Sequence, residues 1–319
     1  MSEVEAMSER AASTPVPPFF SVVVPTCERP AQLAACLRAL ARADYPRERF
    51  EVIVVDDGGA TPLACVLGQF RETFELKLFE QGNAGPAAAR NFGAAQARGE
   101  FLAFTDDDCE PDAGWLRALA LRLAKSPRGI VGGRTLNALP ENLCAETSQR
   151  IIEVVYAHFN ADPDDARFFA SNNFAVSAAR FREVGGFDDT FRTSEDREIC
   201  ARWRARGGKL TYAPEAVIRH AHPLTPRTLW RQHFGYGRGA QRFHRAAGGG
   251  ARFKPDLIFY LKLFSSGAAR ARRAAQLPRA AKLTLLLVWS QLANAAGFLY
   301  EGFQSRGEDR GGTPRLRGK

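Results

Sequence analysis

Short apolar runs alternate with segments of helical periodicity over the first hundred residues of the chain. Runs at 19–24, 50–55 and 100–105 are rich in β-branched and aromatic residues and end at Pro or Asp, as buried strands do. Between them, 32–41 carries apolar residues at helical spacing and 84–97 is rich in Ala, so both are predicted helices. This alternation predicts parallel β-α-β units, and therefore an α/β fold with a mostly parallel sheet flanked by helices.

The distribution of polar and apolar residues divides the chain into four parts. Residues 1–18 are polar and Pro-rich, and we expect them to form a disordered N-terminal tail. The α/β pattern runs over 19–225 and defines the expected catalytic domain. We expect a basic helical extension at 226–303 and a second disordered tail at 304–319.

Composition is that of an ordinary globular protein, with 45% hydrophobic and 25% charged residues. Six cysteines are scattered without a C-x-x-C pair, which favours reduced thiols in a reducing compartment. The first part of the chain has no apolar segment of the kind found in secretory signals. We therefore expect a cytoplasmic protein.

Positive charge is concentrated in one block of the chain. The net charge is +9, yet Arg219–Lys282 alone holds fourteen Lys and Arg residues and one acid, Asp256. Such a block indicates an anionic partner: phosphate, a lipid headgroup or nucleic acid. Nucleic acid is not expected, because neither a recognition helix nor basic strands with interleaved aromatics are visible.

An apolar segment follows this basic block. Leu283–Tyr300 contains no charged residue, and it is short and polar for a membrane span. An interfacial helix on an anionic membrane, at the inner face of the plasma membrane, fits the basic flank. A helix packed on the domain or on a second subunit fits equally well, and the sequence leaves both open.

Acidic residues follow two of the predicted strands. Asp56-Asp57 come directly after the strand predicted at 50–55, and Asp106-Asp107-Asp108 follow the one predicted at 100–105. The carboxyl ends of parallel strands meet in one crevice, so we expect these acids to lie close together. Carboxylate oxygens suit Mg²⁺ or Mn²⁺. A solvated acidic turn is the alternative.

Several short motifs stand in a characteristic order along the chain. They are S-V-V-V-P-T at 21–26, V-V-D-D-G-G at 54–59, G-N-A-G-P-A-A-A-R-N at 82–91, D-D-D at 106–108, S-E-D at 194–196 and V-I-R-H-A-H at 217–222. Together they resemble the family 2 glycosyltransferases, which are inverting enzymes with the glycosyltransferase A fold. The resemblance covers about Ser21 to His222, although Gly59 replaces the usual Ser of the second motif.

The resemblance implies a nucleotide-binding sheet and a nucleoside diphosphate sugar donor, with a uridine diphosphate sugar expected first. It implies a glycan or lipid-linked acceptor, in cell-surface glycan, polysaccharide or glycolipid synthesis. The donor residues implied by this resemblance are Pro25 and Thr26 beside the base, Asp56, Asp57 and Arg90 on the base, and Asp106 and Asp107 toward the ribose and diphosphate.

The metal and catalytic residues are implied in the same way. Asp108, with Asp106, His220 and His222, is expected to hold Mg²⁺ or Mn²⁺. The pair Glu195-Asp196 opens a predicted helix, and Asp196 is expected to be the general base.

Each of these residues also has a plainer explanation. Asp56 fits an ordinary Asp-Gly turn, and Arg90 fits a solvated helix face. Acids in a first helical turn suit the helix dipole, and a buried His is often structural. Two other classes of function remain as alternatives: a non-catalytic nucleotide-sugar-binding protein and a basic nucleic-acid-binding protein.

Overall fold

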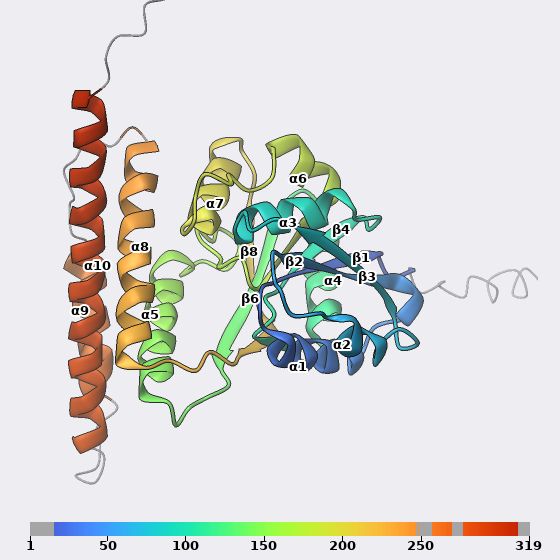
Figure 1. The fold of residues 1–319 in the computed structure, drawn as a ribbon, viewed down its shortest axis with the longest axis horizontal. Coiled ribbons are helices and arrows are strands. Elements are labelled where there is room, and N and C mark those ends of the chain that lie inside the picture. Colours follow the sequence, from blue (N-terminus) through green and yellow to red (C-terminus); the bar gives the residue numbers. More distant parts are fainter. Residues whose placement is uncertain (1–15, 247, 249–256, 270–276, 312–319) are drawn as a thin grey trace, which may run out of the picture.

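One mixed sheet forms the centre of the molecule, with helices on both faces and a group of long helices along one side (Figure 1). The computed structural model describes residues 16–246, 248, 257–269 and 277–311. Most of the tail expected at 1–18, and residues 312–319 of the second expected tail, lie outside the described residues. So do Arg252, Lys254, Arg270, Arg272 and Arg273 of the basic block.

Eight strands form the sheet in the order β3-β2-β1-β4-β7-β6-β8-β5. Their bounds are β1 Phe20–Thr26, β2 Phe50–Asp57, β3 Glu75–Gln81, β4 Phe101–Phe104, β5 Cys109–Pro111, β6 Ile130–Asn137, β7 Phe174–Ser177 and β8 Leu210–His220. The first half, β3-β2-β1-β4, is entirely parallel, as are β6 and β8. The pairs β4–β7, β6–β7 and β5–β8 are antiparallel, so the expected α/β fold is confirmed with a sheet that is parallel mainly in its first half.

Ten α-helices and one short 3₁₀-helix are found among the described residues. They are α1 Pro30–Ala41, η2 Arg47–Arg49, α2 Ala64–Gly68, α3 Pro86–Ala95, α4 Trp115–Lys125, α5 Leu143–Phe159, α6 Ala178–Val184, α7 Glu195–Ala205, α8 Pro226–Ala246, α9 Leu257–Ala269 and α10 Leu277–Gly311. The strands expected at 19–24, 50–55 and 100–105 correspond to β1, β2 and β4. The expected extension begins where α8 begins.

The central strands β1 and β2 are buried on both faces, which explains their continuous apolar runs. Side chains alternate between the faces: Val22 and Val24 join the core formed with α1, whereas Val23 faces α3. Gly93 of α3 permits this close packing. A Cβ atom built at Gly93 would lie 2.6 Å from the Val23 side chain.

One charged residue is fully buried among these strands. Glu51 accepts a hydrogen bond from Ser21 Oγ at 2.6 Å and pairs with Lys77 Nζ at 2.8 Å. Arg98 also contacts the Glu51 carboxylate, and Gly99 donates its N–H to Ser21 Oγ. A buried carboxylate is tolerated only with such partners, and these join β1, β2, β3 and the segment before β4.

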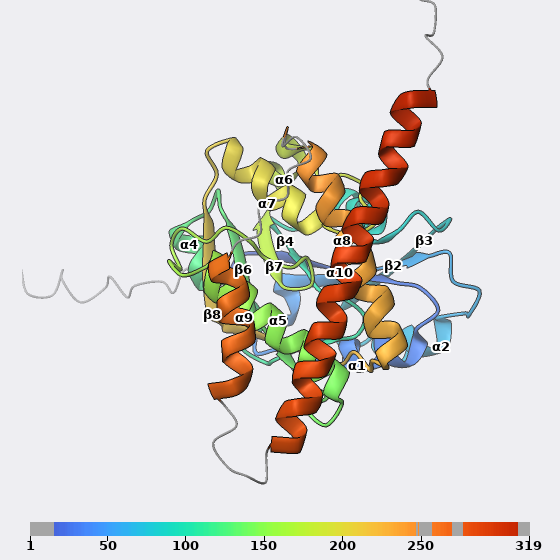
Figure 2. The same ribbon diagram turned by 90° about the vertical axis from the view of Figure 1, so that its left-hand side faces the viewer.

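The long helices α8 and α10 lie side by side with very close backbones (Figures 1 and 2). A Cβ atom at Gly237 would lie 1.9 Å from the Asn294 carbonyl oxygen, and one at Gly297 would lie 2.0 Å from that of Phe234. Glycine at both positions therefore lets the helices touch. Arg238 and Arg242 then both pair with Glu301, at 2.7 and 2.5 Å.

The C-terminal helix extends past residue 304, where a tail was expected, and it contains the apolar segment expected to lie on a membrane or to pack on protein. The disordered tail expected from 304 is wrong at its start, since α10 continues to Gly311. The segment Pro278–Ser305 is the one described helix that qualifies as a membrane span by length and composition, and 28% of its most apolar stretch is buried. One side packs on α8, whereas Leu285, Leu292 and Phe303 are exposed.

Candidate active site

The expected crevice forms where β1, β2 and β4 end. Thr26 is the register partner of Asp56, so the ends of β1 and β2 lie side by side. Thr26 Oγ1 donates to Asp107 Oδ2 at 2.7 Å, which joins the end of β1 to the acids after β4. Burial raises the pKa of Asp107 to about 6, although the hydrogen bond from Thr26 opposes that rise. The acids predicted to converge from separate strands do so.

A residue that the sequence reasoning missed partly neutralises these acids. Arg29, just before α1, places its Nη1 3.3 Å from Asp107 Oδ1 and 3.1 Å from Asp108 Oδ2. About half of its side chain is exposed, so this guanidinium lies at the mouth of the crevice. An Arg after the Pro25-Thr26 turn is the signal that would have found it.

Asp108 and His220 meet because β5 pairs with the end of β8. Cys109 is the register partner of His220, and Ala221 donates its N–H to the Asp108 carbonyl at 2.7 Å. The Asp108 Oδ1 atom lies 3.2 Å from His220 Nε2. Burial alone would raise the pKa of Asp108, but the hydrogen bond and charge of His220 lower it to about 2.

The second histidine lies next to the first. The rings of His220 and His222 are 5.1 Å apart, and both face the acids, as alternate positions suggested. Burial and the charge of His220 lower the pKa of His222. Burial also acts on His220, yet Asp108 raises its pKa above the ordinary value.

The ligand atoms of Asp108, Cys109 and His220 lie within 4.8 Å of one another. A carboxylate oxygen and an imidazole nitrogen suit Mg²⁺ or Mn²⁺, so these side chains fit the expected cation. Burial raises the pKa of the Cys109 thiol well above its ordinary value, which keeps the sulfur protonated. Of the three, Asp108 and His220 are the side chains that could hold such a cation, and Cys109 is a packed neighbour.

Arg90 lies between two acids, whereas the family resemblance implied a contact with the nucleobase. The residue is buried, with its Nη2 2.5 Å from Asp106 Oδ1 and its Nη1 3.1 Å from Glu195 Oε1. Both terminal nitrogens are thus engaged by acids, and Asp106 is held toward Arg90. The base contact expected of Arg90 and the metal contact expected of Asp106 stay predictions.

Asp57 and Asp56 have different surroundings. Asp57 accepts the backbone N–H groups of Ala84 and Gly85 at 2.8 Å, and also the Gln81 side chain, so it fixes the loop before α3. Asp56 accepts one N–H, from Gly59, at 2.9 Å. Of the pair, Asp56 is the carboxylate with capacity left for a ligand, and it lies beside Thr26.

The start of α7 carries the predicted catalytic pair. Glu195 is buried and bound to Arg90 and Ser171, whereas the half-buried Asp196 accepts a hydrogen bond from the Arg197 N–H. Burial and the neighbouring charge of Glu195 raise the pKa of Asp196 to about 7. Such a carboxyl gains and loses its proton at neutral pH, which is the property of a general acid or base.

The turn before this pair is strained and is held by α8. Ser194 has φ +70°, a left-handed conformation that is uncommon for a residue with a side chain. Thr193 Oγ1 donates to the Gly235 carbonyl at 2.9 Å, and a Cβ atom at Gly239 would lie 2.4 Å from Thr193 Oγ1. Glycine on this face of α8 therefore supports the strained turn.

Helix α8 also reaches the histidines. Gln232 lies 3.5 Å from His222 Nδ1 and donates to the Tyr236 hydroxyl at 3.0 Å. Burial and the charge of Asp196 raise the pKa of Tyr236 above its ordinary range. The extension thus forms one wall of the site.

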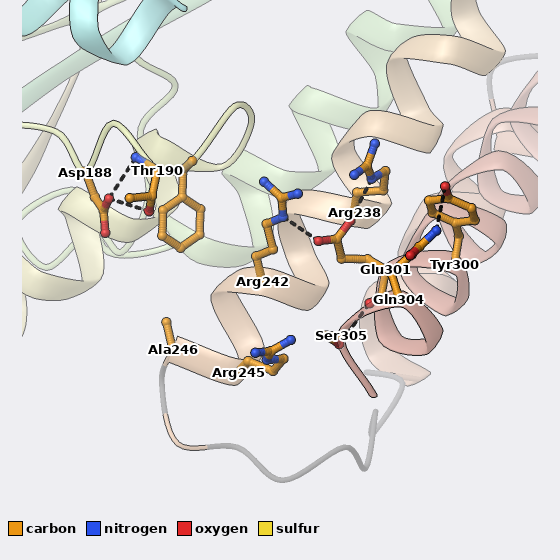
Figure 3. Close-up of a pocket in the computed structure, with 11 residues that line it drawn as sticks. Asp188, Thr190, Arg238, Arg242, Arg245, Ala246, Tyr300, Glu301, Gln304 and Ser305 are labelled. Carbon is orange, nitrogen blue, oxygen red and sulfur yellow. Dashed lines mark hydrogen bonds and ion pairs between the residues drawn. The ribbon is translucent and has the colours of Figure 1, made fainter. Parts of the chain in front are cut away.

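A basic cavity of about 680 Å³ opens between α8, α10 and the loop around Asp188 (Figure 3). Arg238 and Arg242 point toward Glu301 in this view, and Arg245 lies one turn further along α8. The lining contains neither the strand-end acids nor Glu195 and Asp196. The cavity is therefore separate from the crevice at the strand ends.

Comparisons with known proteins agree with this geometry. Residues 21–191 match the model of glycosyl transferase family 2, and 116–301 match that of glycosyl transferase family group 2. Glycosyltransferase AglE of Haloferax volcanii is 27% identical over 70% of this chain and 73% of its own length. The pre-mycofactocin glycosyltransferase of Mycobacterium tuberculosis is 31% identical over 54% of this chain, which spans 37% of that relative.

Solved structures show the same fold at low sequence identity. Mannosyltransferase PcManGT from Pyrobaculum calidifontis, in complex with GDP-Man and Mn²⁺, aligns with a TM-score of 0.62 at 19% identity. The alignment covers 92% of this chain and 88% of that one. Residues 1–349 of Staphylococcus aureus TarS align with a TM-score of 0.54 at 16% identity, over 91% and 92% of the two chains.

Replacing Arg90 should destabilise the fold, because Arg90→Gln leaves Asp106 and Glu195 facing each other without a cation. Removing one partner of a buried ion pair costs about 3–5 kcal/mol, and we expect the lower end because Asp106 is partly exposed. Urea unfolding followed by circular dichroism measures the change.

The matched control is Arg117→Gln, which removes the exposed pair with Asp44. That change should cost at most about 1 kcal/mol. Equal unfolding midpoints for the two variants would contradict a central structural role for Arg90.

Proposed function

This chain belongs to glycosyl transferase family 2 and is a glycosyltransferase, and from that premise we propose that it transfers a sugar from a nucleoside diphosphate sugar to an acceptor hydroxyl in one inverting displacement. A uridine diphosphate sugar is the donor we expect. One observation carries the proposal: Arg90 joins the strand-end acids to the helix that begins with Glu195 and Asp196. A donor site and a base would then share one crevice.

On the donor side, we assign the nucleobase to Asp56. Its buried carboxylate has one hydrogen-bond donor, and a pyrimidine N–H would supply another. Pro25 and Thr26 at the end of β1 border this position. Thr26 binds Asp107, and we assign the ribose to Asp107. The relatives in solved structures carry GDP-Man and UDP-GlcNAc, so sugar nucleotides of both kinds bind this fold.

Asp108 and His220 would hold Mg²⁺ or Mn²⁺, with His222 beside them. When bound, the cation supplies Lewis-acid chemistry that neutralises charge on the leaving diphosphate. The low pKa of Asp108 keeps its carboxylate ionised for this role at neutral pH. Arg29 reaches the same acids and provides positive charge at the outer side of the site.

On the acceptor side, Asp196 would remove the proton of the acceptor hydroxyl as that oxygen attacks the anomeric carbon. The carbon–oxygen bond to the diphosphate breaks on the opposite face, and the proton stays on the Asp196 carboxyl. A base with a pKa of about 7 is well matched to neutral solution. Glu195 is bound to Arg90 and would act by positioning its neighbour.

We also propose that α10 lies on an anionic membrane surface of the cytoplasmic leaflet. Its exposed side carries Leu285, Leu292, Leu299 and Phe303, and the helix is flanked by Arg279 and Lys282. An amphipathic helix beside basic residues is the arrangement that binds such surfaces. This would suit a lipid-linked acceptor.

Sugar nucleotides should raise the melting temperature in a metal-dependent manner, because a ligand that binds the folded state stabilises it by mass action. In a panel of uridine, guanosine and thymidine diphosphate sugars with Mn²⁺, we expect the largest shift with a uridine donor. Asp108→Ala should abolish both the shift and slow donor hydrolysis. Asp112→Asn, at an exposed acid paired with Arg219, is the control and should bind normally. Full turnover in excess chelator would refute the metal dependence.

Loss of the base should separate binding from transfer. Asp196→Asn should keep donor affinity while transfer falls roughly 10²–10⁴-fold. The pKa of Asp196 is raised, so the carboxyl is protonated below pH 7 and the wild-type rate should rise as pH increases through about 7. The variant should lose that rise, and Asp189→Asn at an exposed acid should keep it. Loss of donor affinity in Asp196→Asn would make Asp196 a binding residue.

Sedimentation with anionic liposomes tests the membrane proposal. The double variant Leu292→Glu and Phe303→Glu should remain in the supernatant, because both side chains lie on the exposed side of α10. Leu121→Glu, at an equally exposed apolar residue of the catalytic domain, should still sediment. High salt should weaken the charge contribution and leave apolar burial largely intact. Wild-type protein that stays soluble at low salt would contradict the proposal.

A further inference from the structure

A second cavity, of about 710 Å³, lies along α7, the helix that begins with the predicted base. It is formed by the end of α5, the loop before β7, one face of α7 and the end of α8. The residues that define its character are Phe159, Arg167, Phe168, Arg197, Arg204 and Phe243. Three arginines and three phenylalanines thus line one space, which combines positive charge with apolar surface.

Arg197 is the central residue of this cavity. Its guanidinium lies over the Phe243 ring, 5.9 Å from the ring centre, and no carboxylate of the described residues forms an ion pair with it. Burial lowers the pKa of Arg197, and the charge of Asp196 only partly opposes that effect. A half-buried cation without an ion-pair partner favours an anionic ligand, because burial removes water that would otherwise stabilise its charge.

The remaining charges fit the same ligand. Arg204 is paired with Asp165 at 3.4 Å, so its charge is compensated. Arg167 is exposed at the rim, and no ion pair of its guanidinium is found among the described residues. Two uncompensated positive charges therefore face the cavity. A phosphate group is anionic at neutral pH and matches them.

The cavity is also connected to the predicted base through two helices. Arg197 directly follows Asp196 on α7, and the two charges act on each other. On α8, Tyr236 lies near Asp196 while Phe243 lies under Arg197. These two residues are seven positions apart, which is about 10 Å along a helix. A ligand in the cavity thus reaches toward Asp196 over the length of about one or two sugar units.

We propose that this cavity binds the acceptor through a phosphate group on Arg197 and Arg167, with an apolar chain packed against Phe159, Phe168 and Phe243. The inference rests on the proposed function, since it takes Asp196 as the group that meets the acceptor hydroxyl. Arginine binds phosphate oxygens through two parallel N–H bonds, and the phenylalanine rings bury hydrocarbon. The acceptor class is therefore a phosphate ester of an apolar alcohol that carries one or two sugars, whose hydroxyl reaches Asp196.

Calorimetric titration with dodecyl phosphate, below its micelle concentration, tests the proposal, with dodecanol and inorganic phosphate as the two half-ligands. We expect dodecyl phosphate to bind at least tenfold more tightly than either, since each half-ligand meets only part of the lining. Arg197→Gln should weaken dodecyl phosphate at least tenfold, and Arg197→Lys should weaken it less. Arg128→Gln, at an exposed arginine before β6, is the matched control and should bind normally.

Arg167→Gln keeps the test valid if Arg197→Gln fails to fold, because Arg167 is exposed and its loss should weaken dodecyl phosphate several-fold. Equal affinity of both arginine variants and the control would overturn the proposal, as would tight binding of dodecanol alone. Binding of uridine diphosphate with Mn²⁺ is measured in parallel. Donor binding without dodecyl phosphate binding refutes the acceptor cavity alone, whereas absent donor binding in the wild type refutes the proposed function.

Discussion

The arrangement of the whole site depends on one buried guanidinium. Arg90 comes from α3, Asp106 from the turn after β4 and Glu195 from the start of α7, and they are brought together by ion pairs of 2.5 and 3.1 Å. Burial lowers the pKa of Arg90, but the charges of Asp106 and Glu195 raise it overall, so the cation persists. The desolvation of three charges is tolerated because each faces an opposite charge. The strand-end acids and the start of α7 are consequently fixed relative to each other.

Features governed by short-range pattern could be predicted from the sequence. Buried parallel strands must be apolar on both faces, so β1, β2 and β4 were visible as runs, and the acids that end them were visible as interruptions. The roles expected of Asp108 and Asp196 came from the resemblance of their motifs, and they stay predictions. The comparisons with known proteins exclude a purely binding role, because the chain is a glycosyltransferase.

Features governed by long-range contacts could not be predicted. The sequence around Arg90 is typical of a surface residue on a helix. Its partner Glu195 lies 105 positions away, so no local pattern indicates the ion pair. The hydrogen bonds from Ala84 and Gly85 to Asp57 could not be predicted, because no local sequence pattern shows them. Arg29 was missed for the same reason. A pattern of residue types gives the positions of acids and bases, whereas their partners depend on how the elements cross in space.

The pairing of β5 with β8 has a consequence for how this protein is assembled during synthesis. The strands β1 to β4 all lie within residues 20–104, so that half of the sheet can form early. Asp108 meets His220 only after about a hundred further residues have been made, which takes on the order of 5–20 s at ribosomal speed. During that interval the acids after β4 lack His220 as a partner. The nascent protein therefore acquires its nucleotide-side core well before the centre that would bind a divalent cation.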